Sequence, residues 1–155
     1  MPKSQTKEEA YEKCEADGMF LPQQDTDFRK INSMLAIIEE DLKTIEELQH
    51  KNDRFNTLYK LSYDVLHILT EAFLLFDKIK SANHQCLFAY LCMQHPELEL
   101  DWDFFEKVRT KRNGIHYYGS SVGRAEWKEI SLQIIVYINT LHRKIREKLA
   151  ETDGF

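Results

Sequence analysis

Residues 55–80 read FNTLYKLSYDVLHILTEAFLLFDKIK, and this stretch decides the fold. Its apolar residues recur at steps of three and four, which is the spacing of one face of an α-helix and not the alternation of a strand. Further apolar and aromatic residues widen that face, which predicts a central helix packed on more than one neighbour. The stripe comprises Leu58, Leu61, Val65, Ile68, Leu69, Ala72, Leu75 and Phe76, widened by Tyr59, Tyr63, Leu66 and Phe73.

Four other segments share this helical period, over about residues 28–48, 82–94, 101–119 and 124–151. Asp25 or Asp27 can cap the first segment, and Pro96 follows the end of the second. The helix over 101–119 should weaken around Gly114 and end by Gly119. No segment alternates like a strand, so we predict an all-α, up-and-down bundle of about five helices over residues 25–155. Residues 1–24 form an extension, either disordered or a short helix over 6–16.

The composition fits one globular domain, with 43% hydrophobic and 30% charged residues. The formal net charge of -5 argues against broad electrostatic capture of duplex nucleic acid, although a local basic pocket needs only a few cations. No apolar run approaches the roughly 20 residues that span a bilayer. The polar start also lacks the apolar core of a signal peptide. These features predict a cytoplasmic protein without membrane contact.

The three cysteines are Cys14, Cys86 and Cys92, an odd number without metal-ligand spacing. Cys86 and Cys92 flank a helical run, which predicts buried free thiols in a reducing compartment. No CxxC or CxxH pattern accompanies them, so no zinc site is expected.

The most chemically loaded segment is Arg109-Thr-Lys-Arg-Asn-Gly-Ile-His-Tyr-Tyr-Gly119. On a helix, Arg112 and His116 project from one face, as do Arg109 and Asn113. Arginine offers a planar charged fork for phosphate, and histidine moves protons near neutral pH. Together they suffice for cleavage of RNA without a metal, in which a base activates the 2′-OH and arginine stabilises charge on phosphate oxygens. The same residues could also only cap a helix end, with Tyr117-Tyr118-Gly119 serving as packing and a terminator.

This segment resembles the motif of HEPN domains, the higher-eukaryote and prokaryote nucleotide-binding family. Its signature is an arginine, usually followed by a polar residue, and then a histidine after four to six residues. Arg109 fits the longest form of that gap, with six residues before His116, whereas Arg112 carries the common Arg-Asn pair but has only three residues between it and His116, one short of the usual gap. Residues 59–76 and 81–91 are similar to the family's central and next helices, so the resemblance covers about residues 25–150.

The resemblance implies a homodimer in which two copies of the motif face one cleft, with no metal and no cofactor. Many members are endoribonucleases that leave a 2′,3′-cyclic phosphate, often toxins restrained by a nucleotidyltransferase antitoxin. Others are non-catalytic modules that bind a nucleotide or a protein. The implied catalytic residues are Arg112, His116, Asn113 and Arg109, with Tyr118, Tyr117 and His84 contacting RNA or nucleotide.

Several other polar residues have two interpretations. His67 and His84 could line the cleft, but hydrogen-bonded core positions suit their apolar helices better. Asp64 and Glu71 could orient the motif or form exposed salt bridges. The basic run at His142, Arg143, Lys144 and Arg146 could guide RNA, although such runs are usually a solvated helix face.

Overall fold

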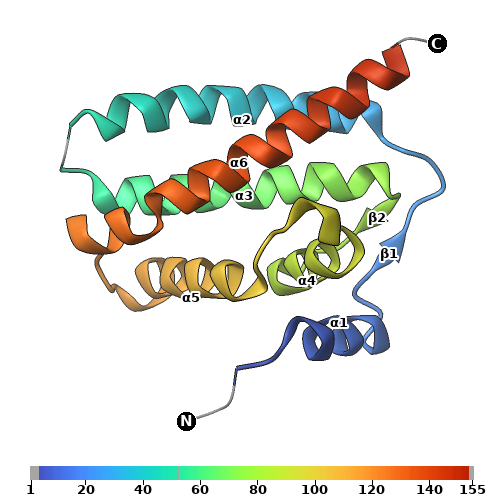
Figure 1. Ribbon diagram of the computed structural model, residues 1–155, viewed down its shortest axis with the longest axis horizontal. Helices are drawn as coiled ribbons and strands as arrows, with labels where there is room; N and C mark the ends of the chain where they lie inside the picture. The colour runs from blue at the N-terminus through green and yellow to red at the C-terminus, as the bar shows by residue number, and fades with distance from the viewer. Residues whose placement is uncertain (1–3, 52, 154–155) are drawn as a thin grey trace.

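The central helix α3 (Phe55–Phe76) runs through the middle of the protein in the computed structural model, which describes residues 4–51 and 53–153. Helices α2 (Phe28–Gln49) and α6 (Arg124–Asp153) lie along one side of it, and α4 (His84–Gln94) and α5 (Trp102–Tyr118) lie on the other (Figure 1). Tyr63, Val65 and Leu69 of α3 are fully buried, because helices cover α3 on both sides. The predicted helical bundle is thus confirmed.

Capping side chains fix where several helices begin. Asp27 accepts a hydrogen bond from the Lys30 N–H at 3.0 Å and starts α2, which decides between the two candidate caps. Asn83 caps α4 through the Cys86 N–H at 2.9 Å. Asp101 caps α5 as expected.

The predicted weakening of helix α5 at Gly114 does not occur, because the helix continues without a break to Tyr118. It ends at Gly119, whose φ of 68° lies in the left-handed region that glycine adopts without strain. The Gly114 carbonyl accepts bonds from the N–H groups of both Gly119 and Ser120, which closes the last turn. Gly114 therefore lies inside the helix and also supplies its terminal acceptor.

The central helix ends four residues before the predicted Lys80. Lys78 adopts a φ of 60°, and the chain then forms strand β2 (Ile79–Lys80), which pairs antiparallel with β1 (Leu21–Pro22). Two-residue strands are too short for an alternating pattern, so periodicity could not reveal them. This small sheet lies at one end of the bundle, where α3 ends and α4 begins (Figure 1).

The amino-terminal segment forms helix α1 (Lys7–Ala16), which packs against α4. Cys14 and Cys86 form a disulfide with their Cα atoms 5.7 Å apart, so the predicted free thiol at Cys86 is wrong. Seventy-two positions separate the two residues in sequence, and only the docking of α1 brings them together. Cys92 is free and buried, and burial raises its pKa to about 12. None of the described helices is both long and apolar enough to cross a membrane.

Candidate functional site

The Arg112 side chain lies between the end of α5 and the middle of α3. Its guanidinium covers the Tyr63 ring, 5.4 Å from the centroid, and its Nη2 lies 3.4 Å from Oδ1 of Asp64. Only 16% of the Arg112 side chain is exposed, and its Nε is buried without a hydrogen-bond partner among the described residues. Arg112 thus makes one long ionic contact and leaves guanidinium N–H groups for another acceptor.

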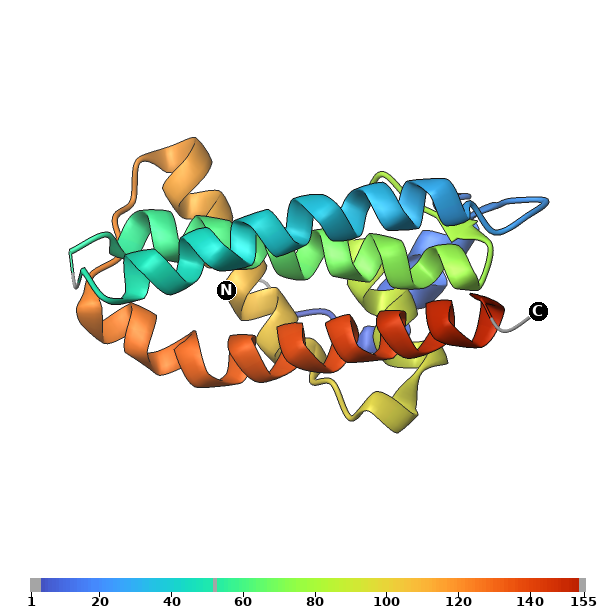
Figure 2. The ribbon, with the colours of Figure 1, turned by 90° about the horizontal axis from the view of Figure 1, so that it is seen from above.

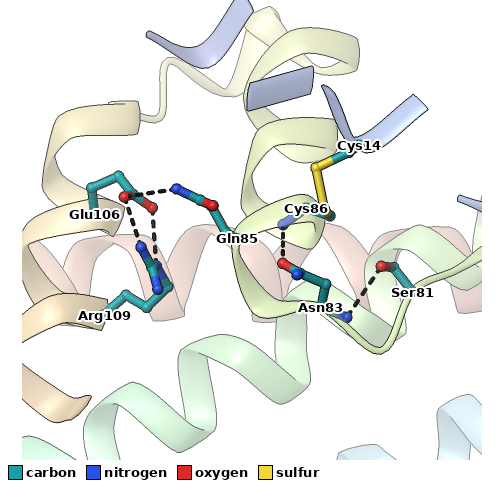
Figure 3. The surroundings of a disulfide bond; sticks show 7 residues. All are labelled: Cys14, Ser81, Asn83, Gln85, Cys86, Glu106 and Arg109. Carbon is teal, nitrogen blue, oxygen red and sulfur yellow. Dashed lines mark hydrogen bonds and ion pairs between the residues drawn. A yellow bond between two sulfur atoms is a disulfide. The ribbon is translucent and has the colours of Figure 1, made fainter. Parts of the chain in front are cut away.

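Arg109 is held much more tightly. Its Nε and Nη2 donate to the two carboxylate oxygens of Glu106 at 3.0 and 2.9 Å, a bidentate pair within one turn of α5. Gln85 of α4 donates to the same carboxylate at 3.0 Å, as Figure 3 shows. The hydrogen bonds that Arg109 donates to Glu106 raise the pKa of Arg109 above its ordinary value. The fork of Arg109 is therefore already occupied by a carboxylate.

The outer end of the motif is open to solvent. His116 is exposed and lies edge-on to Tyr117, with ring centroids 4.7 Å apart. Tyr117 and Tyr118 are 65% and 82% exposed, which is unusual for such large side chains. Asn113 is half-buried one position after Arg112. Cation, histidine and aromatic surface thus meet at the end of α5.

His67 and His84 form a half-buried pair behind the motif. Their rings stack with centroids 3.6 Å apart, and Nδ1 of His84 lies 2.9 Å from the Tyr63 hydroxyl. Burial, helped by the nearby His84 and Arg112, lowers the pKa of His67 to about 3. Burial and the Arg112 charge also lower the pKa of His84. The His67 ring is therefore neutral at pH 7, and Tyr63 lies between His84 and the Arg112 guanidinium.

Asp64 connects this half-buried pair to the open end of α5. Burial raises its pKa, while the charges of Arg112, His84 and His116 and the hydrogen bond from Arg112 oppose that rise. On α2, burial and the charges of Glu40 and Asp64 raise the pKa of Asp41. Asp64 is therefore a partly desolvated carboxylate that contacts the motif directly through Arg112, and its charge acts on Asp41.

The basic run of α6 is largely neutralised by acidic neighbours. Arg146 pairs with Glu39 of α2, and Nε2 of His142 lies 3.4 Å from the same carboxylate. Arg143 and Lys144 both approach Glu147 within the helix. This arrangement agrees with the interpretation of the basic run as a solvated helix face, and it leaves little net positive charge to attract RNA.

A cavity of about 910 Å³ lies between α5 and α6 and is lined by α5 residues such as Thr110 and Lys111 rather than by Arg112 or His116. Four carboxylates line it against two lysines, and Lys107 is paired with Glu129. Such a balance repels a polyanion. The carboxylates belong to Asp103, Glu106, Glu126 and Glu129.

Sequence reasoning missed Glu106, Gln85 and the contact of Tyr63 with Arg112. Glu106 stands three residues before Arg109, a spacing that places both on one helix face, so this pair was visible in principle. Gln85 and Tyr63 contact α5 from other helices, and no local sequence pattern indicates these contacts.

Among the described residues, no group of three or more His, Cys, Asp or Glu side chains is arranged to hold a metal ion. No protein-family model, curated protein or solved structure matches the chain.

Proposed function

We propose that the protein is a metal-independent endoribonuclease of the HEPN type, acting as a homodimer through Arg112 and His116. One observation carries the choice of residues: Arg112 keeps guanidinium donors free beside an exposed histidine, whereas Glu106 occupies Arg109. A phosphate can take the place of a single 3.4 Å contact to Asp64 more easily than it can break a bidentate pair. Arg112 is thus the phosphate ligand, and Arg109 stiffens the helix that presents it.

The reaction is a transesterification within the RNA strand. His116 takes the proton of a 2′-OH, and the resulting oxygen attacks the adjacent phosphorus. The bond from phosphorus to the 5′ oxygen breaks, that oxygen leaves with a proton, and a 2′,3′-cyclic phosphate remains. Arg112 stabilises the charge that develops on the non-bridging oxygens. His116 of the partner subunit is the donor of the leaving-group proton, which is why the proposal requires a dimer.

The surface around this pair supplies substrate contacts. Tyr117 and Tyr118 present exposed rings on which unpaired bases can stack, a contact worth about 1–3 kcal/mol per base. Asn113 adds an amide that can hydrogen-bond to sugar or base. His84, by contrast, acts from behind, because its hydrogen bond to Tyr63 fixes the ring on which Arg112 lies.

The test is cleavage of a single-stranded RNA in EDTA, with detection of the cyclic phosphate end. His116→Ala should lower the rate about 100-fold or more, the usual contribution of a proton-transfer group. Arg112→Lys keeps the charge beside Asp64 but loses the fork, so it should slow cleavage while preserving folding. Arg143→Gln, on an exposed side chain of α6, is the matched control. Equal activity in all four proteins would assign the cleavage to a contaminant.

A non-catalytic module is the second candidate, and the pairing of both motif arginines with carboxylates favours it. Such a module would bind a nucleotide or a protein partner with the same surface and leave RNA intact. Filter binding of the same RNA distinguishes the two candidates. Retention of intact RNA by the wild-type protein, and its loss in Arg112→Lys, would identify a binding module.

A toxin–antitoxin role for the enzyme can be tested in cells. Expression of the wild-type protein should be toxic, His116→Ala should not be, and a nucleotidyltransferase-type partner should relieve the toxicity.

A further inference from the structure

A second cavity, of about 250 Å³, lies beside the small β-sheet at one end of the bundle. Its walls come from α2, α3, α4, the two strands and the turn after β2, which meet at that end of the bundle (Figures 1 and 2). The Arg112 and His116 site lies on α5, and no residue of α5 lines this cavity. The cavity is therefore a separate feature of the fold.

The inner wall of this cavity is apolar. Met34 of α2, Leu75 of α3 and Leu87 of α4 line it, and each of them is more than nine-tenths buried. These three side chains belong to the core of the protein, so the inner wall is fixed by packing. A ligand would bury hydrocarbon against them.

The rim of the cavity carries an excess of positive charge. Lys30 of α2 and Lys80 of β2 line it, and neither forms a salt bridge with any other described residue. Glu71 is the one carboxylate among the described lining residues. It lies 3.8 Å from Nε2 of the neutral His67 ring, and burial raises its pKa while the charge of Lys30 opposes that rise. Two lysines against one glutamate leave a net charge of about +1, which matches a monoanion.

Ser81 adds a buried hydrogen-bond donor to the lining. It is 7% exposed, and its Oγ accepts a bond from the Asn83 N–H at 3.3 Å (Figure 3). Within the described part of the chain its hydroxyl donates to no acceptor, so its hydrogen is available to a ligand. A buried hydroxyl without an acceptor is unfavourable, and a bound carboxylate would satisfy it.

We infer that this cavity binds a small amphipathic monocarboxylate, with its hydrocarbon on Met34, Leu75 and Leu87 and its carboxylate between Ser81 and the two lysines. A volume of 250 Å³ is the space that about eight water molecules occupy in the liquid. That space suits a medium-chain acid such as octanoate. The inference does not depend on the proposed ribonuclease activity.

The test is titration of the full-length protein with octanoate, octanol and octylammonium, followed by backbone amide NMR. Octanoate should bind with a Kd of about 1 mM or tighter, as expected for a ligand of this size, and shift the amides of residues 79–87. The neutral alcohol should bind at least fivefold more weakly, because it loses the charged contacts. Octylammonium should bind more weakly still.

Variants separate the cavity from nonspecific binding. Lys80→Met and Lys30→Met should each weaken octanoate about fivefold, whereas Lys43→Met should have no effect. Lys43 lies on the same helix as Lys30 but about 20 Å farther along it. Circular dichroism checks that each variant is folded. Octylammonium binding as tight as octanoate would assign the rim to Glu71 and overturn the inference, as would octanoate shifts confined to other residues.

Discussion

Removal of the Cys14–Cys86 disulfide should destabilise the protein by an amount that the chain topology sets. The bond joins residues separated by 72 positions and, in the chain-entropy relation, restricts the unfolded chain by about 4 kcal/mol at 25 °C. Both cysteines are buried, so Cys14→Ala/Cys86→Ala avoids placing new hydroxyl groups in the core. The double variant should therefore lose about 4 kcal/mol of unfolding free energy.

Urea unfolding followed by circular dichroism measures this loss. The slope of free energy against urea should rise in the variant, since an unfolded chain without the cross-link exposes more surface. Wild-type protein held under a reductant should behave like the variant, which controls for the alanine substitutions. Thiol titration in denaturant should find one reactive thiol in the oxidised protein, that of Cys92. Three reactive thiols, or a loss below about 1 kcal/mol, would refute the reasoning.

Three further predictions concern the half-buried histidines and the core. Because burial lowers the pKa of His67 to about 3, its contribution to the free energy of unfolding is complete above about pH 6.5 and is smaller by about 2 kcal/mol at pH 5. In His67→Gln, the free energy of unfolding should therefore depend less on pH between 6.5 and 5. An unchanged pH dependence would contradict this prediction. His95 shows the opposite sign, because its hydrogen bond to Asp77 raises its pKa. Its contribution is complete below about pH 6.5 and is lost as the pH rises through the folded pKa, so His95→Gln should remove that loss in urea titrations at increasing pH. Phe105 is fully buried and stacks on Phe88 at 4.5 Å, so Phe105→Ala should cost about 3–5 kcal/mol in urea unfolding; a cost below 1 kcal/mol would mean that its site collapses.

The helices could be predicted because each has a repeating apolar face that spans several turns. The apolar stripe of α3 and the caps at Asp27 and Asp101 depend only on residues close together in the chain, so a single sequence is enough to predict them. The predicted end of α3 at Lys80 lies beyond its real end at Phe76 because Ile79 continues the apolar spacing in a different conformation. A two-residue strand leaves no period by which to recognise it.

The disulfide could not be predicted from the same information. Cys14 and Cys86 meet only because α1 docks on α4, and α1 has a mostly charged sequence with few apolar residues to indicate its partner. Two of its buried residues are Ala10 and the bonded cysteine itself. The disulfide thus holds a helix that buries few apolar side chains against the bundle. Removal of the disulfide should therefore lower the free energy of unfolding substantially.

Residue spacing alone does not decide which of the two motif arginines binds phosphate, and the contacts between helices supply the missing information. Both precede His116 on one helix, and counting residues cannot rank them. Glu106 occupies the fork of Arg109, and Gln85 holds that carboxylate from α4. Arg112 instead lies on Tyr63 with one contact to Asp64, so a phosphate that binds it displaces one weak ion pair. Because a bidentate pair must break before Arg109 can bind phosphate, Arg109→Lys should reduce stability more than RNA cleavage, and Arg112→Lys should do the reverse.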